Sequence, residues 1–320
     1  MKLSIIIVTW NVKADLAACL SSLKKNAPLP DYETIVVDNN SSDGTAEYIK
    51  QHFPQVKVIE NRENKGFAKA NNQGIRASKG EYIFLLNPDT IVHPGSLDIL
   101  VDFMDDNPDA GACGGKLLNA DGSVQRSVRR FPTFRAVLYC HTVFRLLRIF
   151  RGSYKKWRMK EFGYDRQIPV DQLMGAALLL RISAIDTGET LDESFFMYFE
   201  EVDLCYRIKQ AGWRIEFVPN SNITHLGGQS SKQVPLKRIM LFKSMLRYFR
   251  KHRGKFEIAL FSIVFKIALI LRNFLHLVIN MITYLWAFCS RNKSRMIKAS
   301  DRIILHALYL TRYLWQIIRL

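Results

Sequence analysis

The chain has 320 residues, of which 48% are hydrophobic, so it can bury a sizeable core, and disorder is excluded as its default state. Its formal net charge is +17, yet residues 1–235 carry 29 Lys and Arg against 27 Asp and Glu, whereas residues 236–320 carry 17 against 2. This asymmetry predicts a nearly neutral domain, 1–235, followed by a basic region, 236–320, with an anionic partner, either a membrane or a nucleic acid.

The N-terminal residues 1–8 are apolar but too few for the hydrophobic stretch of a signal peptide, and they are interpreted as a buried first strand. Five cysteines are scattered singly, with neither a CxxC pair nor a zinc-site spacing. We interpret them as reduced thiols in a cytosolic compartment.

Apolar or β-branched runs then alternate with helix-like stretches. The predicted strands are residues 3–8, 33–37, 56–60 and 82–86, and the predicted helices are residues 16–25, 44–52 and 67–77. This alternation is typical of an α/β domain with a largely parallel sheet, in which ligands bind beyond the carboxyl ends of the strands. Three polar clusters follow such ends: Thr9-Trp10-Asn11, Asp38-Asn39-Asn40 and Asn87-Pro88-Asp89.

The pattern weakens over residues 116–170, where basic and aromatic residues mix. A loop over an active site and a merely solvated surface are both open interpretations of this stretch. Regular structure is expected again over residues 174–182, 195–211 and 213–218. No GxGxxG follows the first strand, which disfavours a dinucleotide-binding fold.

Two carboxylates at strand ends could carry chemistry. Asp38 could accept hydrogen bonds from a nucleobase or ribose, or it could belong to a turn in which Ser42 or Asp43 caps the next helix. Asp89 could hold Mg²⁺ or Mn²⁺ against a diphosphate, or it could be part of an ordinary Pro-Asp turn.

A third acidic group follows the aromatic run at residues 195–199. Desolvation could raise the pKa of one of Glu200, Glu201 and Asp203 towards general-base function. The alternative is an acidic first helical turn with Asp203 paired to Arg207. We expect both interpretations to hold, for different residues. His225 is a lone histidine that gains interest only if the fold brings it to Asp89.

These segments, in this order, resemble the family 2 glycosyltransferases of the GT-A fold, in particular their rhamnosyltransferase-like branch. The resemblance covers about the first 230 residues and rests on these segments: Ile7 to Asn11; Val37 to Thr45; Asn64 to Ala68 with Asn71, Asn72 and Gly74; Leu86 to Asp89; Gly175-Ala176; and Phe196, Asp203, Leu204, Arg207, Gly212 and Trp213. It implies a Rossmann-like nucleotide-diphospho-sugar transferase fold, α/β, with a mostly parallel central sheet.

The resemblance also implies site residues and a mechanism. Glu201 stands where the family has its catalytic base, with Glu200 beside it, and Asp89 where a divalent cation, Mg²⁺ or Mn²⁺, meets the diphosphate. His225 resembles a histidine that some members add to the metal shell. The implied reaction is a single displacement that inverts the anomeric centre. The implied nucleotide-sugar contacts are Thr9, Trp10, Asn11, Asp38, Asn40, Lys65 and Asn87.

Three positions depart from the common family pattern. Asn87 replaces the first carboxylate of an Asp-x-Asp motif, Glu201 replaces an aspartate, and Asn71 stands where many relatives have an arginine. The first and third are typical of the rhamnosyltransferase-like branch, which favours dTDP-rhamnose as donor over a UDP-sugar. The acceptor is expected to be a lipid-linked or cell-surface glycan. The departures also leave open an inactive glycosyltransferase-like subunit of a membrane-bound assembly complex.

Residues 256–289 are largely apolar, and basic residues flank both ends. The main interruptions are Glu257, Lys266, Arg272, Asn273, His276 and Asn280. Lys266, Asn273, Asn280 and Tyr284 fall on one helical stripe. An amphipathic helix in the membrane plane, or a re-entrant hairpin, is therefore favoured over a span. The long apolar runs argue against nucleic acid as the partner. We predict attachment to an anionic membrane at its cytoplasmic face, with a helical subdomain packed on the core or on a second chain as the alternative.

Overall fold

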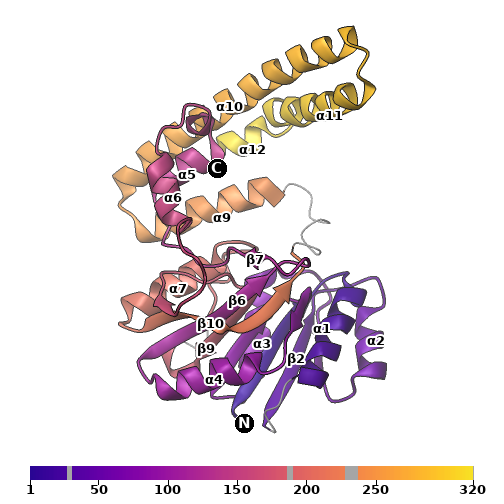
Figure 1. The fold of residues 1–320 in the computed structure, drawn as a ribbon, viewed down its shortest axis with the longest axis vertical. Coiled ribbons are helices and arrows are strands. Elements are labelled where there is room, and N and C mark those ends of the chain that lie inside the picture. Colours follow the sequence, from indigo (N-terminus) through magenta and orange to yellow (C-terminus); the bar gives the residue numbers. More distant parts are fainter. Residues whose placement is uncertain (27–30, 186–189, 228–236, 320) are drawn as a thin grey trace. The chain divides into compact units, whose positions relative to one another are not determined.

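The computed structural model describes residues 1–26, 31–185, 190–227 and 237–319. They form two compact units, each shown by its elements in Figure 1: unit 1 is Met1–Phe131 with Glu161–Ser244, and unit 2 is Pro132–Lys160 with Met245–Leu320. The division drawn from the charge asymmetry, at residue 235, lies outside the described residues. It assigned residues 132–160 to the first domain, whereas their contacts group them with the C-terminal helices.

Unit 1 is built on one sheet with the strand order β3-β2-β1-β4-β9-β6-β10-β5. Four strands at one side are parallel, namely β1 (Leu3–Thr9), β2 (Tyr32–Asp38), β3 (Lys57–Glu60) and β4 (Tyr82–Leu86). The other strands are β5 (Thr90–Val92), β6 (Ala110–Leu118), β7 (Val124–Gln125), β8 (Ile168–Pro169), β9 (Ala177–Arg181) and β10 (Arg214–His225).

The expectation of a mostly parallel sheet is wrong for this second group, and the sheet is mixed. β9 runs antiparallel to both of its neighbours, β4 and β6, while β10 is parallel to β6 and antiparallel to β5 and β8. Strand direction depends on the path of the connecting segment, because antiparallel neighbours do not require a helical crossover. The residues before β9 carry no periodic pattern that would reveal this path.

The helices of unit 1 cover the two faces of the sheet. They are α1 (Lys13–Asn26), α2 (Thr45–His52), α3 (Phe67–Arg76), α4 (Ser96–Asp106) and α7 (Glu200–Gln210), with a 3₁₀ turn η2 (Ile182–Ala184). All seven residues of β1 are buried, as expected for a strand covered on both faces. Leu3, Ile5 and Ile7 join the same core as α1 and α4, whereas Ile6 faces α3, where Gly74 leaves room for it.

Unit 2 is helical. It contains α5 (Phe134–His141), η1 (Val143–Arg145), α6 (Arg151–Trp157), α10 (Lys255–Cys289), α11 (Lys293–Leu310) and α12 (Leu314–Ile318), and the boundary between the units falls within α9 (Lys237–His252). Phe134 of α5 stacks on Phe261 with ring centroids 4.3 Å apart and lies 4.7 Å from the ring of Phe249. This aromatic cluster ties residues 132–160 to helices that follow about 100 residues later in the chain.

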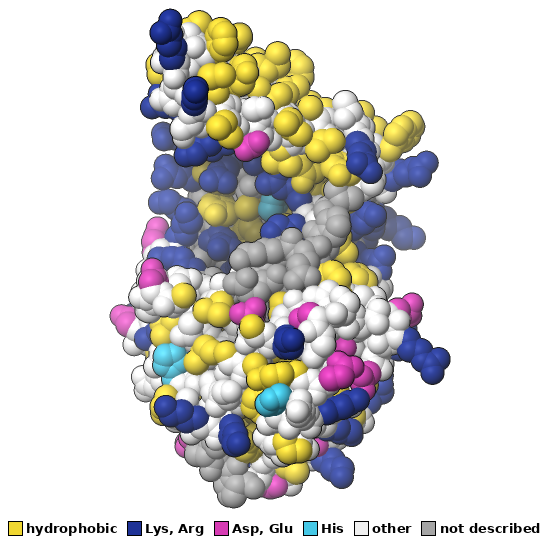
Figure 2. Space-filling model, turned by 90° about the vertical axis from the view of Figure 1, so that its right-hand side faces the viewer, with side chains coloured by type: hydrophobic (Ala, Val, Ile, Leu, Met, Phe, Trp, Pro, Cys, Tyr) yellow, Lys and Arg dark blue, Asp and Glu magenta, His cyan; other side chains and the backbone are white. Residues whose placement is uncertain are grey.

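Helix α10 exposes many large apolar side chains, while Asn273 and Asn280 are buried beside apolar residues such as Phe265. Asn273 is 3% exposed and lies 2.9 Å from His306 of α11, between Oδ1 and Nδ1, whereas Ile267 is 62% exposed and Phe274 is 53% exposed. Such a row of exposed apolar side chains is unusual for a helix packed on a water-soluble core. Figure 2 shows hydrophobic side chains gathered on the surface of this part of unit 2. Among the described helices, α10 alone is long and apolar enough to cross a membrane, which is weak evidence by itself.

Candidate active site

A pocket of about 360 Å³ lies at the carboxyl ends of β1 and β4 in unit 1. This is where a ligand site is expected in a sheet of this kind, because the polar residues that follow neighbouring parallel strands meet at one edge. Of the eleven residues that the sequence predicts for the site, seven line this pocket: Thr9, Trp10, Asn87, Asp89, Glu200, Glu201 and His225.

Asp89 and His225 meet because of strand register. Strand β5 begins at Thr90, directly after Asp89, and its pairing with β10 sets Thr90 opposite His225. The Nε2 atom of His225 consequently lies 3.4 Å from Oδ1 of Asp89, and both side chains are buried. The sequence made His225 a candidate metal ligand only if the fold placed it near Asp89. The structure meets that condition.

The surroundings of His225 suit a divalent cation. Its Nδ1 lies 2.7 Å from Oε1 of Gln125, an acceptor, so Nδ1 carries the proton and the Nε2 lone pair points towards Asp89 and the amide of Asn87, 3.3 Å away. Within the described ranges no cluster of three or more His, Cys, Asp or Glu could hold a metal. Asp89 and His225 supply two ligands, which fits a Mg²⁺ or Mn²⁺ ion that takes its remaining ligands from a diphosphate and water.

The two catalytic candidates lie at the start of α7, which begins at Glu200. The turn before it is strained, since Tyr198 and Phe199 both have φ of 69° although neither is glycine. This turn directs Glu200 and Glu201 to the pocket wall. The Oε2 atom of each is buried and receives no hydrogen bond from any described residue. Two such carboxylate oxygens are a sign of function, because a buried polar atom is normally paired in a fold.

Asp203, three residues after Glu200, has a structural role as the partner of Arg207 in a salt bridge. Its carboxylate is fully buried and accepts a hydrogen bond of 2.9 Å from Nε of Arg207, and Arg207 also donates to the carbonyl of Thr190. The prediction that the acids of this segment divide between a salt bridge and the pocket is confirmed for Asp203.

Burial changes the acidity of the pair in the pocket. Desolvation, with the charge of Glu201 added, raises the pKa of Glu200 well above its usual range. Desolvation also raises the pKa of Glu201, and the nearby charge of Arg129 opposes that rise. Both groups therefore hold a proton more tightly than an exposed glutamate does, which is the property required of a general base near neutral pH.

This acidity predicts a pH-dependent gain in stability for Glu200→Gln. Because the pKa of Glu200 is higher in the folded than in the unfolded chain, the folded state loses stability as pH rises from about 4.5 through the folded pKa. Glutamine removes that loss. We expect the variant to melt higher than the wild type at pH 8, by about 2–4 °C for each unit by which the pKa is raised. At pH 4 the two should melt alike. Thermal unfolding across this range measures the difference, and a variant that is less stable at pH 8 would contradict the assignment.

Four predicted nucleotide contacts lie outside the pocket lining and shape the turn after β2. Asp38 accepts hydrogen bonds from the backbone N–H and the hydroxyl of Ser41, and burial raises its pKa. Asn11 accepts a hydrogen bond from the N–H of Ser42 at 2.7 Å, and Asn40 adopts φ of 67°. Lys65 donates its backbone N–H to Asn39, 3.3 Å away. Their contact with a nucleotide stays a prediction.

Several lining residues were missed by the sequence interpretation, among them Asn39, Arg129, Gln172 and Gly175. Arg129 and Gln172 pair through their backbones and bring a positive charge beside Glu201. Arg129 comes from the stretch without periodicity and Gln172 from the two residues just after it, so no local pattern identified them. A side chain at Gly175 would lie 3.2 Å from Cβ of Glu201, so the glycine keeps the space beside that carboxylate open. Its place in the Gly175-Ala176 motif was the available signal.

Gly66 links the loop before α3 to the segment before α7. It adopts φ of 82° and ψ of 173°, a region almost restricted to glycine, and its neighbour Phe67 donates its N–H to the carbonyl of Phe196 at 2.7 Å. A Cβ on Gly66 would lie 2.6 Å from that carbonyl oxygen. The pocket therefore depends on a backbone contact that an added methyl group would break.

We expect Gly66→Ala to lower the free energy of unfolding by about 3 kcal/mol or more, because it combines backbone strain with a backbone clash. Gly95→Ala is the matched control, since Gly95 also has a positive φ but nothing within 4 Å of an added Cβ. That change should lower the free energy of unfolding by only about 1–2 kcal/mol. Urea unfolding of both variants tests this, and equal losses would show that the contact with Phe196 is unimportant.

Comparison with known proteins identifies the family to which the chain is related. The model of the family described as Glycosyl transferase family 2 matches residues 4–168. An N-acetylglucosaminyl-diphospho-decaprenol L-rhamnosyltransferase of Mycobacterium tuberculosis is 31% identical over 254 residues, which cover 74% of this chain and 80% of that protein. The rhamnosyltransferase WbbL of Escherichia coli is 27% identical over 258 residues, covering 78% of this chain and 93% of WbbL.

Solved structures support the fold. GalNAc-T7 in complex with UDP, GalNAc and Mn²⁺ aligns with a TM-score of 0.58 at 19% sequence identity, over 78% of this chain and 48% of that one. The chain thus spans about half the length of that protein. The likeness identifies unit 1 as a GT-A-like α/β fold with a mixed central sheet.

Proposed function

The chain belongs to glycosyl transferase family 2, and from this membership we propose that it transfers rhamnose, or a closely related deoxyhexose, from a nucleotide-sugar to a lipid-linked or cell-surface glycan with inversion of the anomeric centre. Two relatives are rhamnosyltransferases, which favours dTDP-rhamnose over a UDP-sugar as donor. The observation that carries the proposal is a pair of desolvated carboxylates, Glu200 and Glu201, in one pocket with Asp89 and His225.

In this proposal the donor lies with its diphosphate towards Asp89 and His225, and its base and ribose extend towards Trp10 and the turn that contains Asp38. A Mg²⁺ or Mn²⁺ ion held by Asp89 and His225 would supply Lewis-acid stabilisation of the leaving nucleoside diphosphate. The hydroxyl of Thr9, which is buried and receives no hydrogen bond from a described residue, is available to the donor.

Glu201 accepts the proton of the acceptor hydroxyl, and the oxygen then attacks the anomeric carbon on the face opposite the diphosphate. Burial raises the pKa of Glu201 and so strengthens it as a base, while the charge of Arg129 opposes part of that rise. Gly175 leaves the space beside Glu201 open for the acceptor. Attack from the opposite face inverts the configuration in one step.

A lipid-linked acceptor would require the enzyme to act at a membrane surface, and we propose that this is the cytoplasmic face. Helix α10 extends over 35 residues and exposes large apolar side chains along its length, including Phe256, Ile267 and Phe274. At 1.5 Å per residue it is about 52 Å long, which exceeds a hydrocarbon core of about 30 Å and favours a helix that lies in the interface. We propose that unit 2 attaches the enzyme to an anionic membrane surface.

A donor panel tests the proposal. The full chain is heated with dTDP-rhamnose, UDP-N-acetylglucosamine or GDP-mannose, each with Mn²⁺ or Mg²⁺, and thermal stabilisation identifies the donor. The stabilising donor is then assayed with a sugar-diphospho-isoprenoid acceptor. Stabilisation by dTDP-rhamnose followed by transfer with inversion supports the proposal. Stabilisation by another donor overturns the choice of sugar. Failure of every donor to bind would identify the chain as an inactive subunit.

A further inference from the structure

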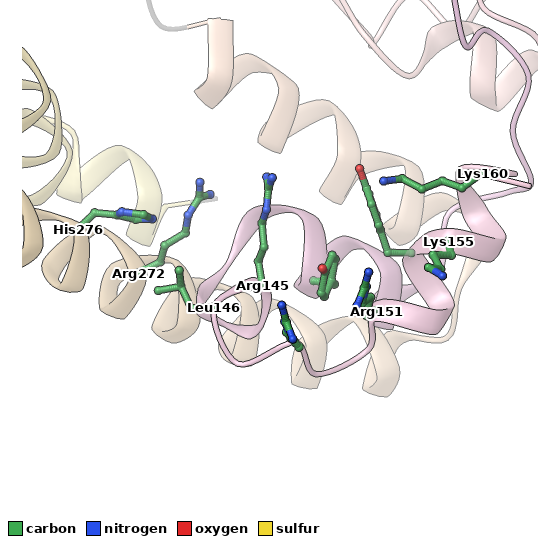
Figure 3. Close-up of a pocket in the computed structure, with 10 residues that line it drawn as sticks. Arg145, Leu146, Arg151, Lys155, Lys160, Arg272 and His276 are labelled. Carbon is green, nitrogen blue, oxygen red and sulfur yellow. The ribbon is translucent and has the colours of Figure 1, made fainter. Parts of the chain in front are cut away.

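A second pocket, of about 650 Å³, lies entirely within unit 2, between the segment from α5 to α6 and helix α10. Six of its ten lining residues are cations, and none is acidic. Figure 3 shows Arg145 and Arg272 extending to the same side of the pocket, with Lys160 reaching towards them from the end of α6. The six cations are Arg145, Arg148, Arg151, Lys155, Lys160 and Arg272.

The charge of this pocket is not balanced within unit 2. The residues of this unit include 22 Lys and Arg but only two acids, Glu257 and Asp301, and neither acid lines the pocket. Among the described residues, no ion pair involves Arg145, Arg148 or Arg151. A concentration of guanidinium groups without carboxylates is suited to phosphate oxygens, which they bind in a bidentate manner.

The pocket is held together by polar contacts inside an apolar helix pair. Nη1 of Arg272, in the middle of α10, donates to the carbonyl of His141 at 2.7 Å and so ties α10 to the end of α5. His276, one turn on, stacks on His306 of α11 with ring centroids 5.1 Å apart, and His306 in turn lies 2.9 Å from Oδ1 of Asn273. Polar residues in such a helix are costly to keep and commonly mark a ligand site.

Apolar side chains surround these cations. Leu147 is 60% exposed and Ile149 is 41% exposed, between the arginines of the same segment, and Leu271 is 45% exposed beside Arg272. Alternation of arginines with exposed aliphatic residues matches the boundary of a bilayer, where phosphate lies directly above hydrocarbon. Tyr139 and Tyr154 also line the pocket, so aromatic rings are present, but a nucleic-acid groove would not place exposed aliphatic side chains between the arginines.

We propose that this pocket binds the phosphate-bearing headgroup of a membrane lipid, with a diphosphate as the best match for six cations that line one pocket. The inference rests on the proposed membrane attachment of unit 2 and is independent of the sugar that unit 1 transfers. It assigns residues 139–160, in which none of the motifs of the family resemblance lies, to recognition of a lipid-borne anion.

The test compares the full chain with two triple variants of equal charge. The pocket variant is Arg145→Gln, Arg148→Gln and Arg151→Gln, and the control is Arg291→Gln, Arg302→Gln and Arg312→Gln, three exposed arginines outside the pocket. Each protein is mixed with phosphatidylcholine vesicles that contain either an isoprenoid diphosphate or phosphatidylglycerol at matched surface charge. Co-sedimentation measures the ratio of the two affinities. The helical circular dichroism of each protein, to which unit 2 contributes, verifies folding in all three proteins.

We expect the wild type and the control to prefer the diphosphate vesicles by about tenfold, since several charge-assisted hydrogen bonds distinguish a diphosphate from a monoester. The pocket variant should lose that preference, and inorganic pyrophosphate should compete only with the wild type and the control. Equal affinity of the wild type for both vesicles, equal loss of preference in both variants, or tighter binding to an RNA oligonucleotide would each overturn the proposal. Failure of sugar transfer with the preference intact would refute the proposed function alone.

Discussion

Glu201→Gln is expected to reduce the rate of sugar transfer by about 10²–10⁴-fold while leaving donor binding unchanged, because glutamine keeps the shape of the side chain but cannot accept the proton of the acceptor. The carboxylate lies in the pocket with one oxygen buried and unpaired among described residues, and glutamine keeps an oxygen that can accept the backbone hydrogen bonds of the other. The measurement is kcat at saturating donor, with donor affinity taken from calorimetry.

Two further variants separate a catalytic role from general damage. Glu47→Gln changes an acid in the first turn of α2, outside the pocket, and should leave kcat unchanged. Glu200→Gln should reduce kcat less than Glu201→Gln, since Glu200 is expected to support the base and not to act as one. If Glu200→Gln abolished transfer while Glu201→Gln retained most of it, the two roles would have to be exchanged.

Asp89→Asn is expected to reduce transfer by about 10³-fold, because a metal that stabilises a leaving diphosphate contributes several kcal/mol to the transition state. The apparent affinity for Mn²⁺ in the presence of donor should fall in parallel, since the variant lacks the charged ligand of the pair. His225→Gln should have a smaller effect on both, because the carboxylate remains. Titration of activity with Mn²⁺ measures these changes.

Asp102→Asn is the control for this series, since Asp102 is an exposed residue of α4 and does not line the pocket. It should leave the Mn²⁺ titration unchanged. Full activity of Asp89→Asn in a metal-chelating buffer would show that transfer proceeds without a cation at this position.

The parallel half of the sheet and seven residues of the candidate site could be predicted because their signals are local. The strands β1, β2 and β4 are short apolar runs that end in polar clusters, and Asp89 and Glu201 belong to motifs of a few residues. The sequence could not predict that His225 lies beside Asp89. That proximity depends on the register of β5 against β10, which is a contact between distant segments.

The remaining features depend on contacts between distant segments. Arg129 reaches Glu201 through a backbone pairing with Gln172, and nothing in the residues around Arg129 reveals it. The direction of β9 is set by its path between β4 and β6. The polar stripe of α10 was visible in the sequence, but its burial against α11 is not, because a stripe does not reveal whether water or another helix covers it.

The discontinuity of unit 2 has a consequence for biosynthesis. Residues 132–160 leave the ribosome before α10 begins at Lys255, so Phe134 has neither Phe249 nor Phe261 to stack on until about 120 further residues have been made. At about 5–20 residues per second this delay lasts roughly 6–24 s. During that time the sheet of unit 1 can form, whereas residues 132–160 still lack their packing partners. The cationic pocket is therefore completed only when the C-terminal helices emerge.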